Sequence, residues 1–154
     1  MGRVQKGLLF LLGVLVLIQF IQPARNTSGQ AYPADISRIY PMQEKVQGIL
    51  KISCYDCHSN NTDYPWYANI QPGGWWLASH IKNGKEELNF NEFGNYSSRR
   101  RQSKLKAIAG SIKDGTMPLA SYTLIHNGAK LNSADKQLLL NWVQRMTDSL
   151  SHNK

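Results

Sequence analysis

The chain has 154 residues, a formal net charge of +8 at pH 7 and 42% apolar residues, which suits one small globular domain. Only 18% of the residues are charged and four are tryptophan, so the sequence lacks the high charge and low hydrophobicity of a disordered chain. Two cysteines are too few for a disulfide scaffold. We therefore expect a folded core that does not depend on disulfides.

An apolar segment at the N-terminus, residues 1–21, predicts export. Residues 7–18 form an unbroken apolar run after Arg3 and Lys6, and the run resumes with Phe20 and Ile21. This is short for a bilayer span, which needs about 20 residues, and is typical of a signal peptide or a minimal anchor. Because no small-x-small cleavage site and no lipid-accepting cysteine follow, we favour an uncleaved anchor over a cleaved signal; a buried core helix is the third alternative.

The basic residues before the apolar run orient it. Lys and Arg on that side predict a cytoplasmic N-terminus and place the rest of the chain on the far side of the membrane. Residues 22–34 contain two prolines, a glycine and small polar residues, a composition typical of a flexible linker. The predicted folded domain spans residues 35–150, with a short tail at 151–154.

The two cysteines are the most informative residues of the chain. Cys54 and Cys57 stand three positions apart, and His58 follows directly, which makes the Cys-x-x-Cys-His signature of c-type haem attachment. Positions i, i+3 and i+4 share one helix face, so in a helix both sulfurs and the imidazole can point at one flat group. The pattern predicts one covalent haem c, with His58 as an axial iron ligand.

Three amphipathic helices are predicted in the domain. The first should start near Pro41 and run into the cysteine motif. The second should follow Ser97 and Ser98 and stop at Gly115, and the third should start at Ser133. No strand pattern is sustained, so the fold class is all-α: a cytochrome c-like helical domain around one haem, preceded by an N-terminal transmembrane or signal helix.

The stretch between the motif and the second helix, residues 59–96, is too long for an ordinary connection. It is rich in Asn, Gly, Pro and aromatic residues. We expect the haem to act as the core that its aromatic side chains need, with a short helix near residues 75–83. Within it, Tyr64, Trp75 and Trp76 are candidates for packing against the haem or for bonding a propionate, although such residues more often only fill a core.

The second face of the iron has three candidate ligands. Met117 is favoured because Pro118 forces the residue before it out of helical geometry, on a loop between two predicted helices; the alternative is that Met117 fills a gap in the core. His80 is the alternative ligand, or it satisfies a buried hydrogen bond. His126 and Met146 read more easily as loop and core residues.

Two other kinds of site use the same cysteine spacing. A dithiol redox site expects a strand-to-helix setting, which this helical sequence does not show. A zinc site needs a fourth ligand, for which His80 or His126 offers only irregular spacing.

A basic stretch runs from Arg99 to Lys113. It holds six lysines and arginines and no acidic residue. It is either a solvated helix face or a docking surface for an acidic redox partner that also offsets haem propionates. Nucleic acid is a poor partner for an exported domain, so we expect none.

Several segments resemble a known family, the membrane-anchored haem-binding domain proteins of bacteria, which are related to small single-haem cytochromes c. The matching segments are CYDCHSNNTDYPWY, WWLASHI and LNF within residues 54–90, GTMPL at 115–119 and LNSAD at 131–135. The resemblance covers most of residues 40–145. It implies an exported domain with haem bound covalently through Cys54 and Cys57, His58 as the proximal ligand and, by analogy with single-haem cytochromes c, Met117 as the distal ligand.

The function that this reading favours is electron transfer between redox partners at the outer face of the inner membrane, rather than catalysis. Two axial side chains leave iron no open position for a substrate. The alternatives are a haem enzyme or a peroxide or gas sensor with an open sixth position, and an interaction module whose haem is only structural.

Overall fold

A computed structural model shows the chain as an assembly of helices and describes residues 2–152. It is 71% helical with no strand among these residues, so the predicted all-α class is confirmed. The helical elements are, in order, α1 (Arg3–Leu17), η1 (Ile18–Phe20), α2 (Ile36–Ile39), α3 (Glu44–Ser53), α4 (Tyr55–His58), η2 (Trp66–Asn69), α5 (Gly73–Glu87), η3 (Phe90–Asn95), α6 (Ser98–Asp114), α7 (Ala120–Ile125), η4 (Asn127–Ala129) and α8 (Ser133–His152).

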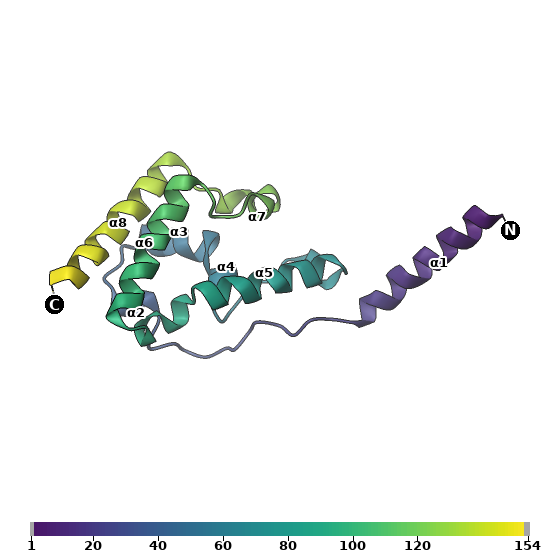
Figure 1. Cartoon of the computed structure of the whole chain (residues 1–154), viewed down its shortest axis with the longest axis horizontal. Coiled ribbons are helices and arrows are strands. Elements are labelled where there is room, and N and C mark those ends of the chain that lie inside the picture. The colour runs from purple at the N-terminus through teal and green to yellow at the C-terminus, as the bar shows by residue number, and fades with distance from the viewer. Residues whose placement is uncertain (1, 153–154) are drawn as a thin grey trace.

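The domain is organised around two long helices that lie side by side, α6 and α8, with α3 against α8 (Figure 1). A second layer is formed by α4 and α5, and η2 packs on α5. The apolar helix α1 stands apart from this assembly, at the far end of the molecule from the end of α8 (Figure 1), and none of its side chains is buried.

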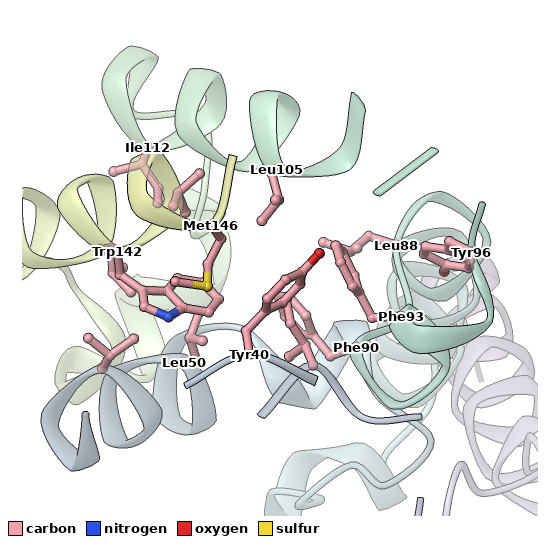
Figure 2. Packing of buried hydrophobic residues seen from close by; sticks show 14 of the residues in the cluster. Tyr40, Leu50, Leu88, Phe90, Phe93, Tyr96, Leu105, Ile112, Trp142 and Met146 are labelled. Atoms are coloured by element: carbon pink, nitrogen blue, oxygen red, sulfur yellow. The ribbon is translucent and has the colours of Figure 1, made fainter. Parts of the chain in front are cut away.

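The main core lies where α3, α6 and α8 meet. Figure 2 shows Trp142 of α8 between Ile112 of α6 and Leu50 of α3. The Trp142 indole N–H donates to the carbonyl of Pro41 at 3.1 Å, so the largest buried side chain is also hydrogen-bonded. A second, smaller cluster of Ala68, Leu77 and Ile81 joins η2 to α5.

The boundaries of the last two long helices follow the predictions. Ser97 is the N-cap of α6, and its side chain accepts from the Arg100 backbone N–H. Gly115 ends that helix in the left-handed conformation, with φ at 68°, which suits glycine because it has no Cβ to clash. Helix α8 begins at Ser133. All three predicted boundaries are confirmed.

The predicted start of the first helix is wrong. Helix α3 begins at Glu44, after Gln43, and Pro41 lies in the connection from α2. Nor does one helix run through the motif: α3 ends at Ser53, Cys54 departs from helical backbone with φ at −134°, and α4 starts a new turn. The motif therefore sits at a bend, with Cys57 and His58 on the second turn.

The stretch 59–96 is better ordered than the sequence indicates. Helix α5 has 15 residues, more than the short helix predicted near 75–83, because it starts at the Gly73–Gly74 pair. The side chains of Leu77 and Phe90 are buried in the two apolar clusters of the chain itself, and Phe90 also lines a cavity beside the cysteine motif.

Residues 22–34, the predicted linker, run along the domain to α2 (Figure 1). Asn26 makes the main contacts: its side-chain amide donates to the Ser59 carbonyl and to Thr62 Oγ1, both at 2.9 Å, and its backbone N–H donates to the Tyr64 hydroxyl at 2.8 Å. The Lys85 ammonium donates to the Asn26 side-chain oxygen at 2.6 Å. Of the predicted tail, residues 151 and 152 belong to α8, and 153–154 lie outside the described residues.

Candidate cofactor site

The cysteine motif lines a cleft formed by two adjoining cavities of about 900 and 820 Å³, both open to solvent. One cavity extends toward α6, and the other toward α5 and α7. The residues shared by both are Ser53, Cys54, His58, Glu87, Met117 and Pro118.

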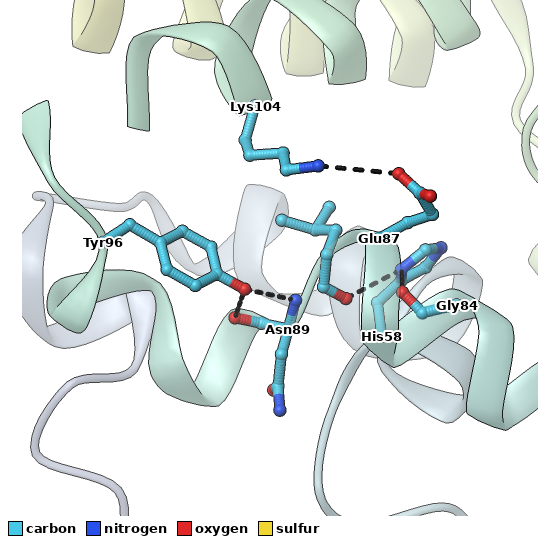
Figure 3. A network of polar contacts seen from close by, with 7 residues as sticks. His58, Gly84, Glu87, Asn89, Tyr96 and Lys104 are labelled. Atoms are coloured by element: carbon cyan, nitrogen blue, oxygen red, sulfur yellow. Dashed lines mark hydrogen bonds and ion pairs between the residues drawn. The ribbon is translucent and has the colours of Figure 1, made fainter. Parts of the chain in front are cut away.

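His58 is held in one tautomer by the end of α5. Its Nδ1 lies 2.9 Å from the Gly84 carbonyl oxygen and 3.0 Å from that of Leu88, shown as dashed lines in Figure 3. Both partners are pure acceptors, so Nδ1 carries the proton and donates it. In the neutral ring Nε2 then keeps its lone pair, which is the arrangement that a metal-ligating histidine needs.

The surroundings of the motif favour uncharged side chains. Burial lowers the pKa of His58, which favours the neutral imidazole. Burial, and then the neighbouring Cys57, raises the pKa of Cys54 to about 12, while burial, and then Asp56, raises that of Cys57 to about 11. The thiols of reactive dithiol sites have a lowered pKa. The raised pKa of both thiols here therefore speaks against a dithiol redox site.

The motif approaches α5 closely at Gly84. A Cβ at this position would lie 2.6 Å from the carbonyl oxygen of Cys57, a distance that two non-bonded atoms do not adopt. Gly84 therefore lets α4 lie directly on α5, and this contact brings His58 within reach of the two carbonyls. The sequence contains the glycine but no local pattern that reveals its neighbour.

The two residues between the cysteines form hydrogen bonds to distant parts of the chain. The Tyr55 hydroxyl donates to Asp35 at 3.0 Å, and its ring stacks on Phe90 with centroids 5.1 Å apart. The Tyr122 hydroxyl of α7 donates to Asp56 at 2.7 Å. Sequence reasoning missed these contacts, since the residues that form them are 20 and 66 positions apart.

Met117 lies on the predicted loop, between α6 and α7, and shares both cavities with His58. The thioether side chain is 38% exposed. His80 reaches only the second cavity, and its Nδ1 lies 2.9 Å from the Trp76 carbonyl of its own helix. The structure thus brings Met117 and, at one side, His80 to the cleft that holds His58.

The other predicted contact residues lie elsewhere. Tyr64, Trp75 and Trp76 line neither cavity of the cleft. The Tyr64 hydroxyl and the Trp75 indole bond the segment that follows α1, and Trp76 stacks beside His80. His126 is in the connection after α7, where it bonds the Tyr67 hydroxyl at 2.8 Å, and Met146 is in the core.

The sequence profile of a family described as a haem-binding domain matches residues 13–145. The chain belongs to this haem-binding domain family. No curated protein and no solved structure matches it.

The cleft of this haem-binding domain suits the group for which the family is named. It combines a neutral imidazole with a free Nε2, two uncharged thiols and mostly apolar walls. Lys104 is the one lysine or arginine among the described residues that line it, and its ammonium lies 3.6 Å from Glu87 beside His58 (Figure 3). Haem has an apolar ring, a central iron and anionic propionates. These match the apolar walls, the imidazole and the lysine of the cleft in polarity.

We predict that Gly84→Ala destabilises the haem-binding domain, because the added methyl group forces α5 away from Cys57. The expected loss is about 1–3 kcal/mol in the free energy of unfolding, measured by chemical denaturation. Gly110→Ala is the matched control: this glycine lies inside α6 with no atom within 4 Å of a built Cβ, so alanine should stabilise by about 0.4–1 kcal/mol. Equal effects of the two substitutions would contradict the close approach.

Proposed function

We propose that this chain is a single-haem c-type cytochrome, with haem bound by thioethers from Cys54 and Cys57 and by His58 on iron. The observation that carries the proposal is the state of His58: Nδ1 is occupied by two carbonyls, Nε2 is free, and both thiols stand beside it at an apolar cleft. Haem supplies one-electron redox chemistry when bound. The chain contributes the ligands, their tautomer and a partly water-excluding pocket.

Met117 is the distal ligand in this proposal. Its loop follows the Gly115 stop, where the backbone N–H groups of Thr116 and Met117 both bond the Ser111 carbonyl. The Tyr122–Asp56 hydrogen bond then ties α7 to the motif. The backbone of the Met117 loop is thus held on one side by α6 and on the other by the bond between α7 and the motif. With side chains on both faces of the iron, the protein carries electrons and has no place for a substrate.

The alternative, a haem enzyme or small-ligand sensor with an open sixth position, has one observation in its favour. Met117 is 38% exposed, so its side chain is not packed in place by neighbours. His80 lines the same cavity and has a free Nε2. In that alternative His80 is a second ligand or a hydrogen-bond donor to a bound molecule.

We further propose that the chain is tethered to the outer face of the inner membrane by its N-terminal helix. Residues Arg3–Phe20 form a helix long and apolar enough to cross a membrane by length and composition, with none of its side chains buried. A signal sequence passes the same test, so release into the periplasm after cleavage is the alternative.

The basic stretch divides into three groups with different surroundings. Arg101 bonds the carbonyls of Gly94 and Tyr96, and Arg100 lies over the Tyr96 ring, 4.0 Å from its centre, so these two support the fold. Lys104 faces the cleft. The remaining three, at spacings of seven, are exposed and line the groove between α6 and α8: Arg99, Lys106 and Lys113.

We assign that groove as the docking face for an acidic redox partner. Its edge carries three cations from α6, and no acidic side chain is among the described residues that line it. A field of one sign steers a partner of opposite charge and is screened by salt.

The axial ligand is tested by absorption spectroscopy of the ferric protein. The unsubstituted chain should show the far-red methionine-to-iron charge-transfer band, Met117→Ala should lose it, and His80→Ala should keep it. A high-spin ferric spectrum in the unsubstituted chain, with rapid binding of cyanide or carbon monoxide, would contradict a closed six-coordinate iron. In Cys54→Ser/Cys57→Ser, haem should separate from the polypeptide under denaturing conditions.

The charge on Lys104 should raise the reduction potential, because a cation beside the cleft disfavours the more positive ferric state. Lys104→Gln is therefore expected to lower the potential measured by spectroelectrochemical titration. Lys106→Gln removes the same charge from the same helix but on the side of the α6–α8 groove, so it should leave the potential nearly unchanged. Equal shifts in the two variants would show that Lys104 has no special place at the cofactor.

Replacing Arg99, Lys106 and Lys113 together by Gln should slow association with a small acidic redox protein and flatten its dependence on ionic strength. Stopped-flow electron transfer over a salt series measures both effects. Lys136→Gln, a single lysine on α8 outside the groove, is the control. A salt dependence that the triple substitution leaves unaltered would place docking elsewhere.

A further inference from the structure

The end of the apolar helix is hydrogen-bonded to the domain. The backbone N–H of Gln71 donates to Gln19 Oε1 at 2.9 Å, and the Gln19 side chain donates back to the Gln71 carbonyl at 3.2 Å. The Gln71 side chain donates to Gln22 Oε1 at 2.9 Å, and the Trp75 indole donates to the Ile21 carbonyl at 2.7 Å. We call these contacts the junction; Gln71 itself is buried, at 3% exposure.

Large apolar side chains from the elements on either side of Gln71 in the chain are exposed. Trp66 is 74% exposed, Ile70 51% and Trp76 44%. They belong to η2, the residue after it and the first turn of α5, the elements that flank Gln71 in the chain. Tryptophan is a residue that folded proteins mostly bury, as Trp142 is in the core. Such a group marks a surface that is covered by something else.

A cation stands beside these side chains. Arg25, four residues beyond Ile21, bonds the Asn69 side chain, and its guanidinium lies over the Tyr64 ring, 4.3 Å from the centre. Tryptophan, tyrosine and arginine at the end of an apolar helix are the residues that collect at the headgroup level of a bilayer.

The length of the helix also brings the junction down to the lipid. The 15 residues of α1 and the three residues of the 3₁₀ helix η1 together span about 28 Å at 1.5 and 2.0 Å per residue, which is shorter than the hydrocarbon core of about 30 Å. A span this short draws its flanking residues into the interface. Phe20 and Ile21 continue the apolar run, and the Ile21 carbonyl already accepts from the Trp75 indole. The short span and the hydrogen-bonded junction therefore hold this end of the domain close to the headgroups.

We propose that η2 and the first turn of α5 form a membrane-contacting face, with Trp66, Ile70 and Trp76 inserted at the headgroup level of the bilayer that α1 spans. This inference rests on the proposed tether and goes beyond it, because a tether alone leaves the domain free above the membrane. The occupant is the lipid surface. A second protein on the same face is the competing outcome of the test.

The test is photocrosslinking in the full-length, haem-loaded chain, reconstituted in vesicles of phosphatidylethanolamine and phosphatidylglycerol. The photoreactive residue p-benzoylphenylalanine replaces Trp66, Ile70, Leu12 or Gln144, one at a time, and adducts are identified by mass spectrometry after irradiation. Leu12 lies within α1 and serves as the lipid-embedded reference. Gln144 is exposed and serves as the solvent reference; its helix, α8, lies at the other end of the molecule from α1 (Figure 1).

Lipid adducts at positions 66 and 70 that approach the yield at 12, and exceed the yield at 144 at least tenfold, support the membrane-contacting face. Lipid adducts at 12 with only the position 144 yield at 66 and 70 overturn it while leaving the tether intact. Crosslinks from 66 and 70 to a second polypeptide in place of lipid overturn it in favour of a protein partner. No lipid adduct at 12 contradicts the tether and, with it, the inference.

Discussion

The hydrogen bond from His58 Nδ1 to the end of α5 is the contact on which the site depends. The last carbonyls of a helix have no partner within it and carry partial negative charge. At the end of α5, the Leu88 carbonyl and the already bonded Gly84 carbonyl share the imidazole proton. The helix end gains a donor, and the imidazole gains a defined tautomer and a more basic Nε2. Without this contact the motif is only two thiols and a ring that is free to turn.

The same motif also links parts of the chain that are distant in sequence. Asp35 at the start of α2 accepts from Tyr55, and Tyr122 on α7 donates to Asp56. The five residues from Cys54 to His58 therefore connect the N-terminal part of the domain, the middle helix and the segment that carries Met117. A cofactor held by this motif would depend on all three parts, because each of them fixes the motif in place.

The sequence predicted well what depends on local chemistry. The capping serine and terminal glycine of α6, the start of α8 and the position of Met117 on a loop each follow from a residue's own backbone preference. It failed where the outcome depends on distant partners. Pro41 suits a first helical turn, but its carbonyl accepts from Trp142, 101 positions away. The contact at Gly84 arises from packing against Cys57, which no pattern around Gly84 reveals.

The tryptophans show the same limit. An aromatic residue near a haem motif looks alike in sequence whether it packs on a cofactor, fills a core or faces outward, and here Trp142 is buried while Trp66 is largely exposed. Composition indicates how much apolar surface a chain has. Only the fold shows which part of that apolar surface remains exposed.

Helix α5 joins two sites at its opposite ends. Its N-terminal end and the residues before it bond the residues that follow α1, and its C-terminal end bonds His58. Between them lie 15 helical residues, a length of about 22 Å. A helix of this length is stiff, so in the proposed tethered cytochrome α5 acts as a spacer, and the number of its turns sets the separation between the proposed anchor and the proposed iron ligand. Under that proposal, the conformation of residues 22–34 does not change this separation, and a redox partner has to bring its own centre to the height that α5 sets.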